Sequence, residues 1–305
     1  MWTVAFHPDG KHLLGGTDNG VQRWRLADGR EVGRQIGTNI QVIAVTRDCQ
    51  RTVCGTLDAG AAVWEGEMDK KVIHVEGTKR VYALDVSTDS TRFATGTFKA
   101  ASIWSVTSGQ QLVGPLRHDS LVTGIRFSPS GEHIATACFG HSIQIFDSHT
   151  GDKLLTVNTV IPQSLGTPLA WSGDGQQIFA VSRDNKIRSF NVSTGSQLAE
   201  SQILHLHDGN DRSVRVRSIA LAGNGKFIAT SVAWYSLLFL DTSTLEQIGY
   251  AIEGSKKMWP LAISVDSSYL AVGQYDGKIV IRDIGKILPD SYGPFHVSQH
   301  NYGML

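Results

Sequence analysis

The sequence predicts an all-β protein, built as a ring of seven four-stranded antiparallel sheets. A strand pattern returns about every 43 residues along the 305-residue chain. The chain has 32 glycines and only 8 prolines, which indicates many tight turns between short strands. Apolar residues make up 41%, enough for a large core. Because one thin sheet cannot bury both of its faces, we expect the sheets to cover one another and the ring to close.

The repeat is plainest around tryptophan. The stretch "GTDNGVQRW" (Gly16 to Trp24) returns as "GTLDAGAAVW" (Gly55 to Trp64) and as "GTFKAASIW" (Gly96 to Trp104). Alignment on the last residue gives Trp24, Trp64, Trp104, Phe146, Phe190, Leu240 and Arg282. The chain then reads as a single domain, 1–305, whose units span 2–37, 40–77, 80–117, 121–158, 167–204, 214–253 and 258–298.

Each unit has the same four elements in the same order. A first strand runs into a turn, as in "WTVAFHPDGK", and a second strand follows, as in "HLLGG". After a tight turn comes a third strand, "VQRWRL", and after a polar turn a weaker fourth, "REVGRQI". The first three are apolar on both faces, which is typical of sandwiched sheets, and the fourth alternates like an outer edge strand. No amphipathic helical segments separate the strands, which argues against a βαβ fold.

These units resemble the WD40 repeat β-propeller family over residues 2 to about 297. The Trp-Asp dipeptide survives in degraded form, as in Phe146-Asp147 and Leu240-Asp241, and the Gly-His dipeptide has one counterpart, His118. The resemblance implies a seven-bladed propeller, with turn aspartates that accept hydrogen bonds and tryptophans that pack near the end of the third strand. It assigns structural roles to Asp18, Trp24, Asp58, Trp64, Trp104, His118, Asp184 and Asp276. The turn aspartate is replaced by Phe98, Gly140 and Trp234.

Ring closure departs from the family pattern. Family propellers often complete the last blade with an N-terminal strand, but this chain begins at the first strand of the first unit. We therefore expect the last unit to take its fourth strand from the tail, within Asp290 to Ser298. This implies a ring closed mainly by side-chain packing, or a native chain that is longer upstream.

Charge and composition narrow the function classes. Lys plus Arg and Asp plus Glu each total 28, so the chain lacks the broad basic surface of a general nucleic-acid or membrane binder. No apolar run is long enough to cross a bilayer, and the start does not resemble a signal peptide. Cys49, Cys54 and Cys138 are expected to be free thiols in a reducing compartment. The predicted location is intracellular, cytoplasmic or nuclear.

The sequence predicts no catalytic residue, cofactor or metal. It has no GxSxG, HExxH or Cys-x-x-Cys pattern. "AGNGKF" (Ala222 to Phe227) lacks the residues of a phosphate loop, and His205 and His207 lack a third ligand nearby. The predicted first strands carry mostly Val, Ala, Ile and Leu, with no convergent acids or histidines. Two alternatives stay open: a hydrolase or oxidoreductase with its site at the channel mouth, and the sensor or autoinhibitory domain of a signalling ATPase.

A partner is expected on the face that carries the turns between second and third strands. Functional residues on rigid β scaffolds concentrate in loops, and aromatic residues with cations are enriched in binding hot spots. The two longest connections, 158–167 and 203–216, open on this face. The predicted partner-binding residues are Lys79, Arg80, Phe98, Lys99, His141, Arg183, Arg215, Trp234, Tyr235, Lys257, Trp259 and Tyr275. We therefore predict a non-catalytic scaffold, a module of a larger assembly, that binds an acidic or phosphorylated protein or peptide.

Overall fold

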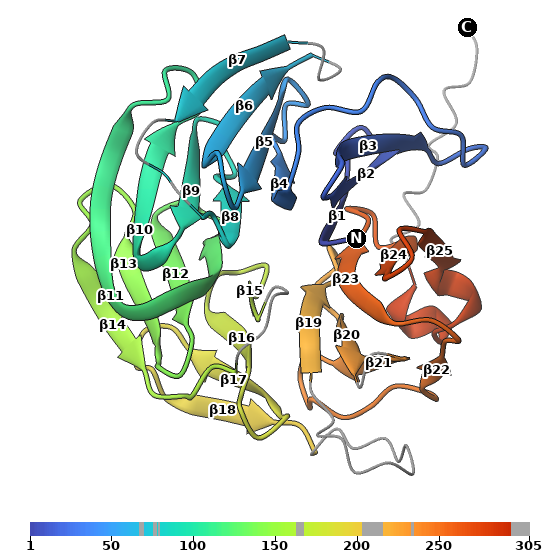
Figure 1. The fold of residues 1–305 in the computed structure, drawn as a ribbon. Coiled ribbons are helices and arrows are strands. Elements are labelled where there is room, and N and C mark those ends of the chain that lie inside the picture. Colours follow the sequence, from blue (N-terminus) through green and yellow to red (C-terminus); the bar gives the residue numbers. More distant parts are fainter. Residues whose placement is uncertain are drawn as a thin grey trace, which may run out of the picture.

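The computed structural model describes residues 1–66, 70–75, 78, 80–162, 168–202, 216–232 and 235–293, with the backbone alone of Arg217 and Trp259. These residues form antiparallel β-sheets and two three-residue 3-10 helices, so the predicted all-β class is confirmed. The sheets lie around a common centre, with the first strand of each on the inside (Figure 1). No helix among the described residues has the length and apolar character needed to cross a membrane.

The first part of the chain forms a three-stranded and a four-stranded sheet. The first sheet contains β1 (Thr3–Phe6), β2 (His12–Thr17) and β3 (Gly20–Arg25). The second contains β4 (Ile40–Val45), β5 (Arg51–Thr56), β6 (Ala61–Glu65) and β7 (Lys70–Val75). Where the first unit was expected to form its fourth strand, only two isolated bridges form, Val21 with Ile36 and Trp24 with Glu31.

The middle of the chain forms a seven-stranded sheet in the order β14 to β8. Its strands are β8 (Ala83–Val86), β9 (Arg92–Gly96), β10 (Phe98–Ser105), β11 (Gln111–Phe127), β12 (His133–Cys138), β13 (Ile143–Asp147) and β14 (Lys153–Val157). The sequence predicted a break between 117 and 121, but β11 continues through it and pairs with β10 and then with β12. The backbone stays extended here because it finds hydrogen-bond partners in both neighbouring strands, and two repeat units therefore share one strand.

Three sheets complete the described chain. They contain β15 (Leu169–Trp171), β16 (Gln177–Val181), β17 (Ile187–Asn191) and β18 (Gln197–Glu200); β19 (Val216–Leu221), β20 (Phe227–Val232), β21 (Ser236–Asp241) and β22 (Ile252–Glu253); and β23 (Met258–Ile263), β24 (Tyr269–Gln274) and β25 (Ile279–Asp283). The helices η1 (Ile284–Lys286) and η2 (Asp290–Tyr292) follow. The predicted tail strand was thus wrong at Asp290–Tyr292, and residues 294–298 lie outside the described residues.

The tail turns helical because it docks on the preceding sheet instead of extending along β25. The Tyr292 hydroxyl donates to Asp241 Oδ2 at 2.8 Å, and Asn224 Nδ2 donates to the Tyr292 carbonyl at 3.2 Å. Leu288 is buried among residues of the last two sheets. These contacts give the hydroxyl and the carbonyl of Tyr292 hydrogen-bond partners, although the tail does not pair with a strand.

The core is divided into apolar clusters that each lie between two successive groups of strands. Trp64 packs between the first and second sheets, and Trp104 packs between the second sheet and β9. The last cluster joins the chain's ends, because Val4 and Leu13 of the first sheet meet Ala271 of β24. The first strands also contact one another in a cycle: β1, β4, β8, β11, β15, β19, β23 and β1 again.

One turn recurs at the end of every first strand. Each of these turns has six residues, and the backbone N–H of the first donates to the carbonyl of the sixth at 2.9–3.0 Å, as from His7 to His12. The fourth residue has a left-handed φ, with Gly10 at 67° and Cys49 at 63°. Seven such turns begin at His7, Thr46, Ser87, Ser128, Ser172, Ala222 and Ser264. Their common geometry places the sequence repeats in structurally equivalent positions.

Candidate protein-binding face

The turns between second and third strands lie beside the connections between sheets. Backbone N–H groups of the turns donate to these connections: Gly140 to the Ile161 carbonyl at 3.0 Å, Arg183 to Val160 at 2.8 Å and Tyr275 to Lys257 at 2.9 Å. Both kinds of loop therefore belong to one face, as expected. We call this the top face, defined by the turns 17–20, 56–61, 97–100, 138–143, 181–187, 235–236 and 274–279 and the connections bonded to them.

The turn between β9 and β10 presents an aromatic ring to solvent. Thr97 Oγ1 and the Thr97 N–H both donate to the Ala100 carbonyl, at 3.1 and 2.8 Å, and close the turn tightly. Phe98 at its tip is 64% exposed, and Lys99 Nζ lies 5.6 Å from the centre of its ring. An exposed aromatic ring offers apolar surface whose burial is favourable, and the neighbouring cation adds a positive charge to it.

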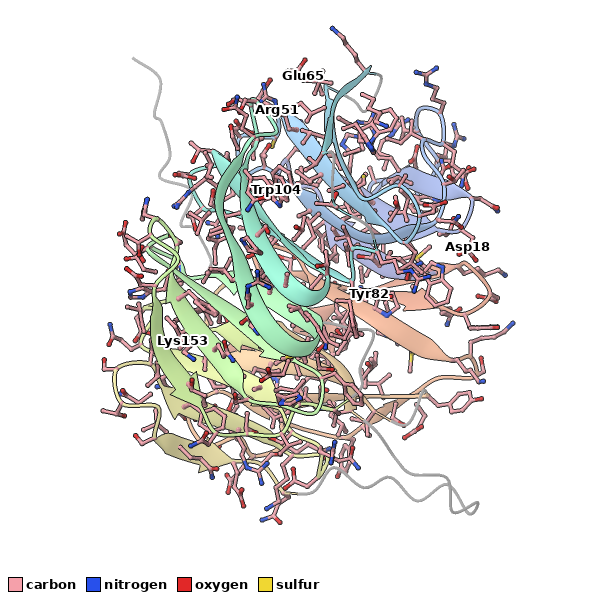
Figure 2. The ribbon with its side chains drawn as sticks, turned by 60° about the vertical axis from the view of Figure 1, so that its left-hand side comes forward. Asp18, Arg51, Glu65, Tyr82, Trp104 and Lys153 are labelled. Carbon is pink, nitrogen blue, oxygen red and sulfur yellow. The ribbon has the colours of Figure 1, made fainter. Side chains whose placement is uncertain are left out.

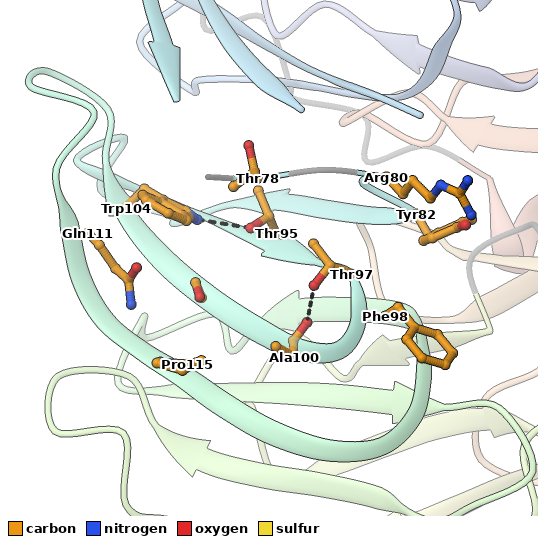
Figure 3. A pocket seen from close by; sticks show the side chains of 11 residues that line it. Thr78, Arg80, Tyr82, Thr95, Thr97, Phe98, Ala100, Trp104, Gln111 and Pro115 are labelled. Carbon is orange, nitrogen blue, oxygen red and sulfur yellow. Dashed lines mark hydrogen bonds between the residues drawn. The ribbon is translucent and has the colours of Figure 1, made fainter. Parts of the chain in front are cut away.

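A groove of about 620 Å³ runs from this turn along β10 (Figure 3). Arg80, Tyr82 and Phe98 gather at one end of it, and Trp104 and Gln111 lie at the other. Its rings offer apolar contact area, and Arg80 is exposed at the mouth with no ion pair to another described residue.

The threonine hydroxyl groups along the groove are already engaged within the protein. Thr95 Oγ1 accepts from Trp104 Nε1 at 2.9 Å, and Thr78 Oγ1 donates to the Val75 carbonyl at 2.9 Å. The threonines of the groove wall are thus engaged, whereas Arg80 provides an exposed positive charge at one end of the groove. Tyr82 and Trp104, which are labelled in Figure 2, lie at opposite ends of this groove in Figure 3.

A second aromatic and cationic group lies on the last sheets. Tyr275 is 70% exposed, and Lys257 Nζ lies 5.7 Å from the centre of its ring. Lys256 Nζ lies 3.0 Å from Asp276 Oδ2, and this hydrogen bond lowers the pKa of that carboxyl group. Tyr235 is 37% exposed, and its carbonyl accepts from the Gly254 N–H at 2.7 Å.

The remaining predicted binding residues form a third group or lie outside the described part. His141 and Arg183 are exposed on neighbouring turns, and a Cβ on Gly140 would lie 3.8 Å from the Arg183 guanidinium. Lys79, Arg215 and Trp234 lie outside the described residues, as does the side chain of Trp259. The contacts thus distribute the predicted residues over three groups on one face.

The turn aspartates that the sequence assigned to structure make specific contacts. Asp18 accepts from Trp2 Nε1 at 2.7 Å, and Asp58 accepts from Asn39 Nδ2 at 2.9 Å, which lowers the Asp58 pKa. Asp184 accepts two hydrogen bonds from Arg188, at 2.8 and 2.6 Å, and they lower its pKa. The partners of these carboxylates differ from turn to turn, although their positions in the repeat are the same.

Two charged residues on the inner strands were missed by sequence reasoning. Asp85 of β8 and Arg126 of β11 form an ion pair at 3.2 Å, and Asp85 Oδ2 also accepts from the Phe127 N–H at 2.8 Å. Burial raises the pKa of Asp85, against the opposing pull of Arg126. The sequence signal that could have revealed this pair is the acidic residue Asp85 within the apolar run "VYALDV". Because the two charges engage each other, they tie neighbouring first strands together.

The chain is similar to a repeat family model and to several curated proteins. The family model "WD domain, G-beta repeat" matches residues 1–25 and 110–147. Autophagy-related protein 16 of Arabidopsis thaliana is 25% identical over 93% of this chain and 47% of its own length. Eukaryotic translation initiation factor 3 subunit I of Candida albicans is 25% identical over 62% of this chain and 58% of its own length. Protein HIR1 of Eremothecium gossypii is 23% identical over 100% of this chain and 47% of its own length. The chain spans about half the length of these curated relatives.

Proposed function

We propose that this chain, which carries repeats of the WD40 family, is a non-catalytic scaffold that binds a protein or peptide on its top face. The observation that carries the proposal is the exposed Phe98, with Lys99 against its ring and a groove beside it that ends at Arg80. Such aromatic and cationic groups are typical of binding hot spots. One relative is by its name a subunit of a larger factor, which agrees with a module that works inside an intracellular assembly.

We infer that the ring is a seven-bladed propeller forming a single domain. Its blades would be the seven units predicted from the sequence, with β11 counted in two of them. The cycle of contacts between first strands and the cluster of Val4, Leu13 and Ala271 support this arrangement. In this arrangement the first and last blades are joined by side-chain packing.

The partner that fits the top face best is acidic or phosphorylated. Arg80, Lys99, Arg183 and Lys257 are exposed on it, although the whole chain carries no net charge. A local cluster of cations beside aromatic rings selects an anionic segment without attracting nucleic acid in general.

A matched pair of variants tests the proposal. Replacing Arg80, Phe98 and Lys99 together by alanine should remove the partners recovered by affinity purification from the native source, without lowering the melting temperature. The control replaces Tyr250 and Lys286 by alanine; both side chains are highly exposed, at 94% and 83%, away from the top face.

Partners lost from the triple variant and retained by the control would support the top face. Equal recovery from both variants would refute the assignment. Phosphatase treatment of the source material tests the chemistry separately, because loss of binding after treatment identifies a phosphorylated ligand and unchanged binding points to carboxylates.

A further inference from the structure

Two imidazoles and a carboxylate converge in the first turn of the chain, between β1 and β2. Asp9 Oδ2 lies 3.0 Å from His7 Nδ1 and 2.7 Å from His12 Nδ1. The three ligand atoms all lie within 4.8 Å of one another, and no other group of three such residues does so in the described part of the chain. The side chains are 12–26% exposed, so the cluster is shielded but open to solvent.

The other turns of the same kind show what is unusual here. Where the first turn has His7, other turns have a serine whose hydroxyl donates to the turn carboxylate: Ser172 to Asp174 at 2.5 Å and Ser264 to Asp266 at 2.6 Å. These serine oxygens also accept the N–H of the sixth residue at 2.9 Å. The first turn keeps the backbone but exchanges the hydroxyl for an imidazole.

This exchange places two imidazole nitrogens on one carboxylate oxygen. His7 Nδ1 lies 3.3 Å from the Asp9 backbone nitrogen and 3.0 Å from Asp9 Oδ2, and His12 Nδ1 lies 2.7 Å from the same oxygen. In the metal-free turn a proton on an imidazole nitrogen bridges it to Asp9 Oδ2, as the serine proton does in the other turns. Unlike a serine hydroxyl, a neutral imidazole can give up this proton and offer its nitrogen to a metal ion.

We propose that His7, Asp9 and His12 form a binding site for a divalent transition metal of the Zn²⁺ class. Two imidazole nitrogens and one carboxylate oxygen suit Zn²⁺, whereas Mg²⁺ and Ca²⁺ prefer oxygen ligands alone. Ligand atoms about 2.0–2.1 Å from Zn²⁺ require only small side-chain shifts from the present spacing. Three protein ligands leave the fourth position to water. The turn lies at the opposite end of β2 from the top face, so this inference does not depend on the proposed binding of a partner.

The test measures Zn²⁺ bound to chelator-treated protein, by equilibrium dialysis with metal analysis and by titration calorimetry. The wild-type chain should bind one Zn²⁺ and gain thermal stability, because a ligand that binds only the folded state stabilises it. His7→Ser, which restores the residue of the sister turns, should fold normally and weaken binding at least tenfold. His12→Gln should do the same.

The matched control is His133→Gln, because His133 occupies the position of His12 in the turn that begins at Ser128. It should leave Zn²⁺ binding unchanged. The proposal would be overturned if His7→Ser and His12→Gln retained Zn²⁺ binding, or if the control lost as much binding as they do. It would also be overturned if the wild-type chain bound no Zn²⁺ at 100 μM, a concentration roughly a thousandfold above the dissociation constants of typical structural sites. Mg²⁺ in place of Zn²⁺ should give no signal, and an equal response to it would overturn the assigned metal class.

Discussion

His118 should make the stability of this protein fall in mild acid. The residue lies in the middle of β11, where it is 6% exposed and its ring meets that of Phe146 edge-on at 5.8 Å. Neither ring nitrogen has a hydrogen-bond partner among the described residues. Burial therefore penalises the charged form and lowers the pKa of His118 from 6.5 to about 4.

The sign and size of the effect follow from linkage. Because the pKa of His118 is lower in the folded state than in the unfolded state, neutral His118 contributes its full share to the free energy of unfolding above pH 6.5. That contribution is lost as the pH falls toward 4. The shift corresponds to about 3 kcal/mol in full, and about 2 kcal/mol of it should be lost between pH 7 and pH 5.

Urea unfolding of the wild-type chain and of His118→Leu, at pH 7 and at pH 5, measures this contribution. Leucine is close in size and cannot titrate, so the variant should lose about 2 kcal/mol less than the wild-type chain between the two pH values. If His118→Leu and the wild-type chain lose the same free energy, the reasoning about burial is refuted.

Three further changes probe the repeated framework, each by urea unfolding. Cys49→Gly should stabilise the fold by about 0.5 kcal/mol, because Cys49 holds a left-handed φ of 63° that glycine adopts freely; destabilisation would contradict this. Arg92→Met should cost about 3 kcal/mol, because it strips buried hydrogen bonds to the carbonyl and hydroxyl of Ser148; a loss under 1 kcal/mol would count against it. Thr95→Val should cost about 1.5 kcal/mol by orphaning the Trp104 indole N–H, whereas Thr95→Ser should retain most of the stability.

The periodic part of the sequence carried most of the information about the fold. Strand order, turn positions and the packing of Trp64 and Trp104 follow from short-range patterns that recur along the chain. The continuity of β11 does not, because "RHDS" resembles a polar break in the sequence, whereas in the structure His118 is buried against the ring of Phe146.

The candidate sites were predictable only in part. Exposed aromatics such as Phe98 and Tyr275 stood out because they replace or adjoin the turn aspartate of the repeat. The pairing of Asp85 with Arg126 joins residues 41 positions apart, and no local pattern reveals which strands will be neighbours. The cluster around Asp9 lies within six residues, yet it becomes visible only when the turn folds the two imidazoles onto one carboxylate.

The shared strand β11 also has a mechanical consequence. At the other described joints, a pull along the ring's circumference would be resisted by side-chain contacts between neighbouring sheets. Along β11 the same pull would act directly on a continuous backbone, whose first part is paired with β10 and whose last part is paired with β12. These two units should therefore behave as one stiff segment, so that bending of the ring is confined to its other joints.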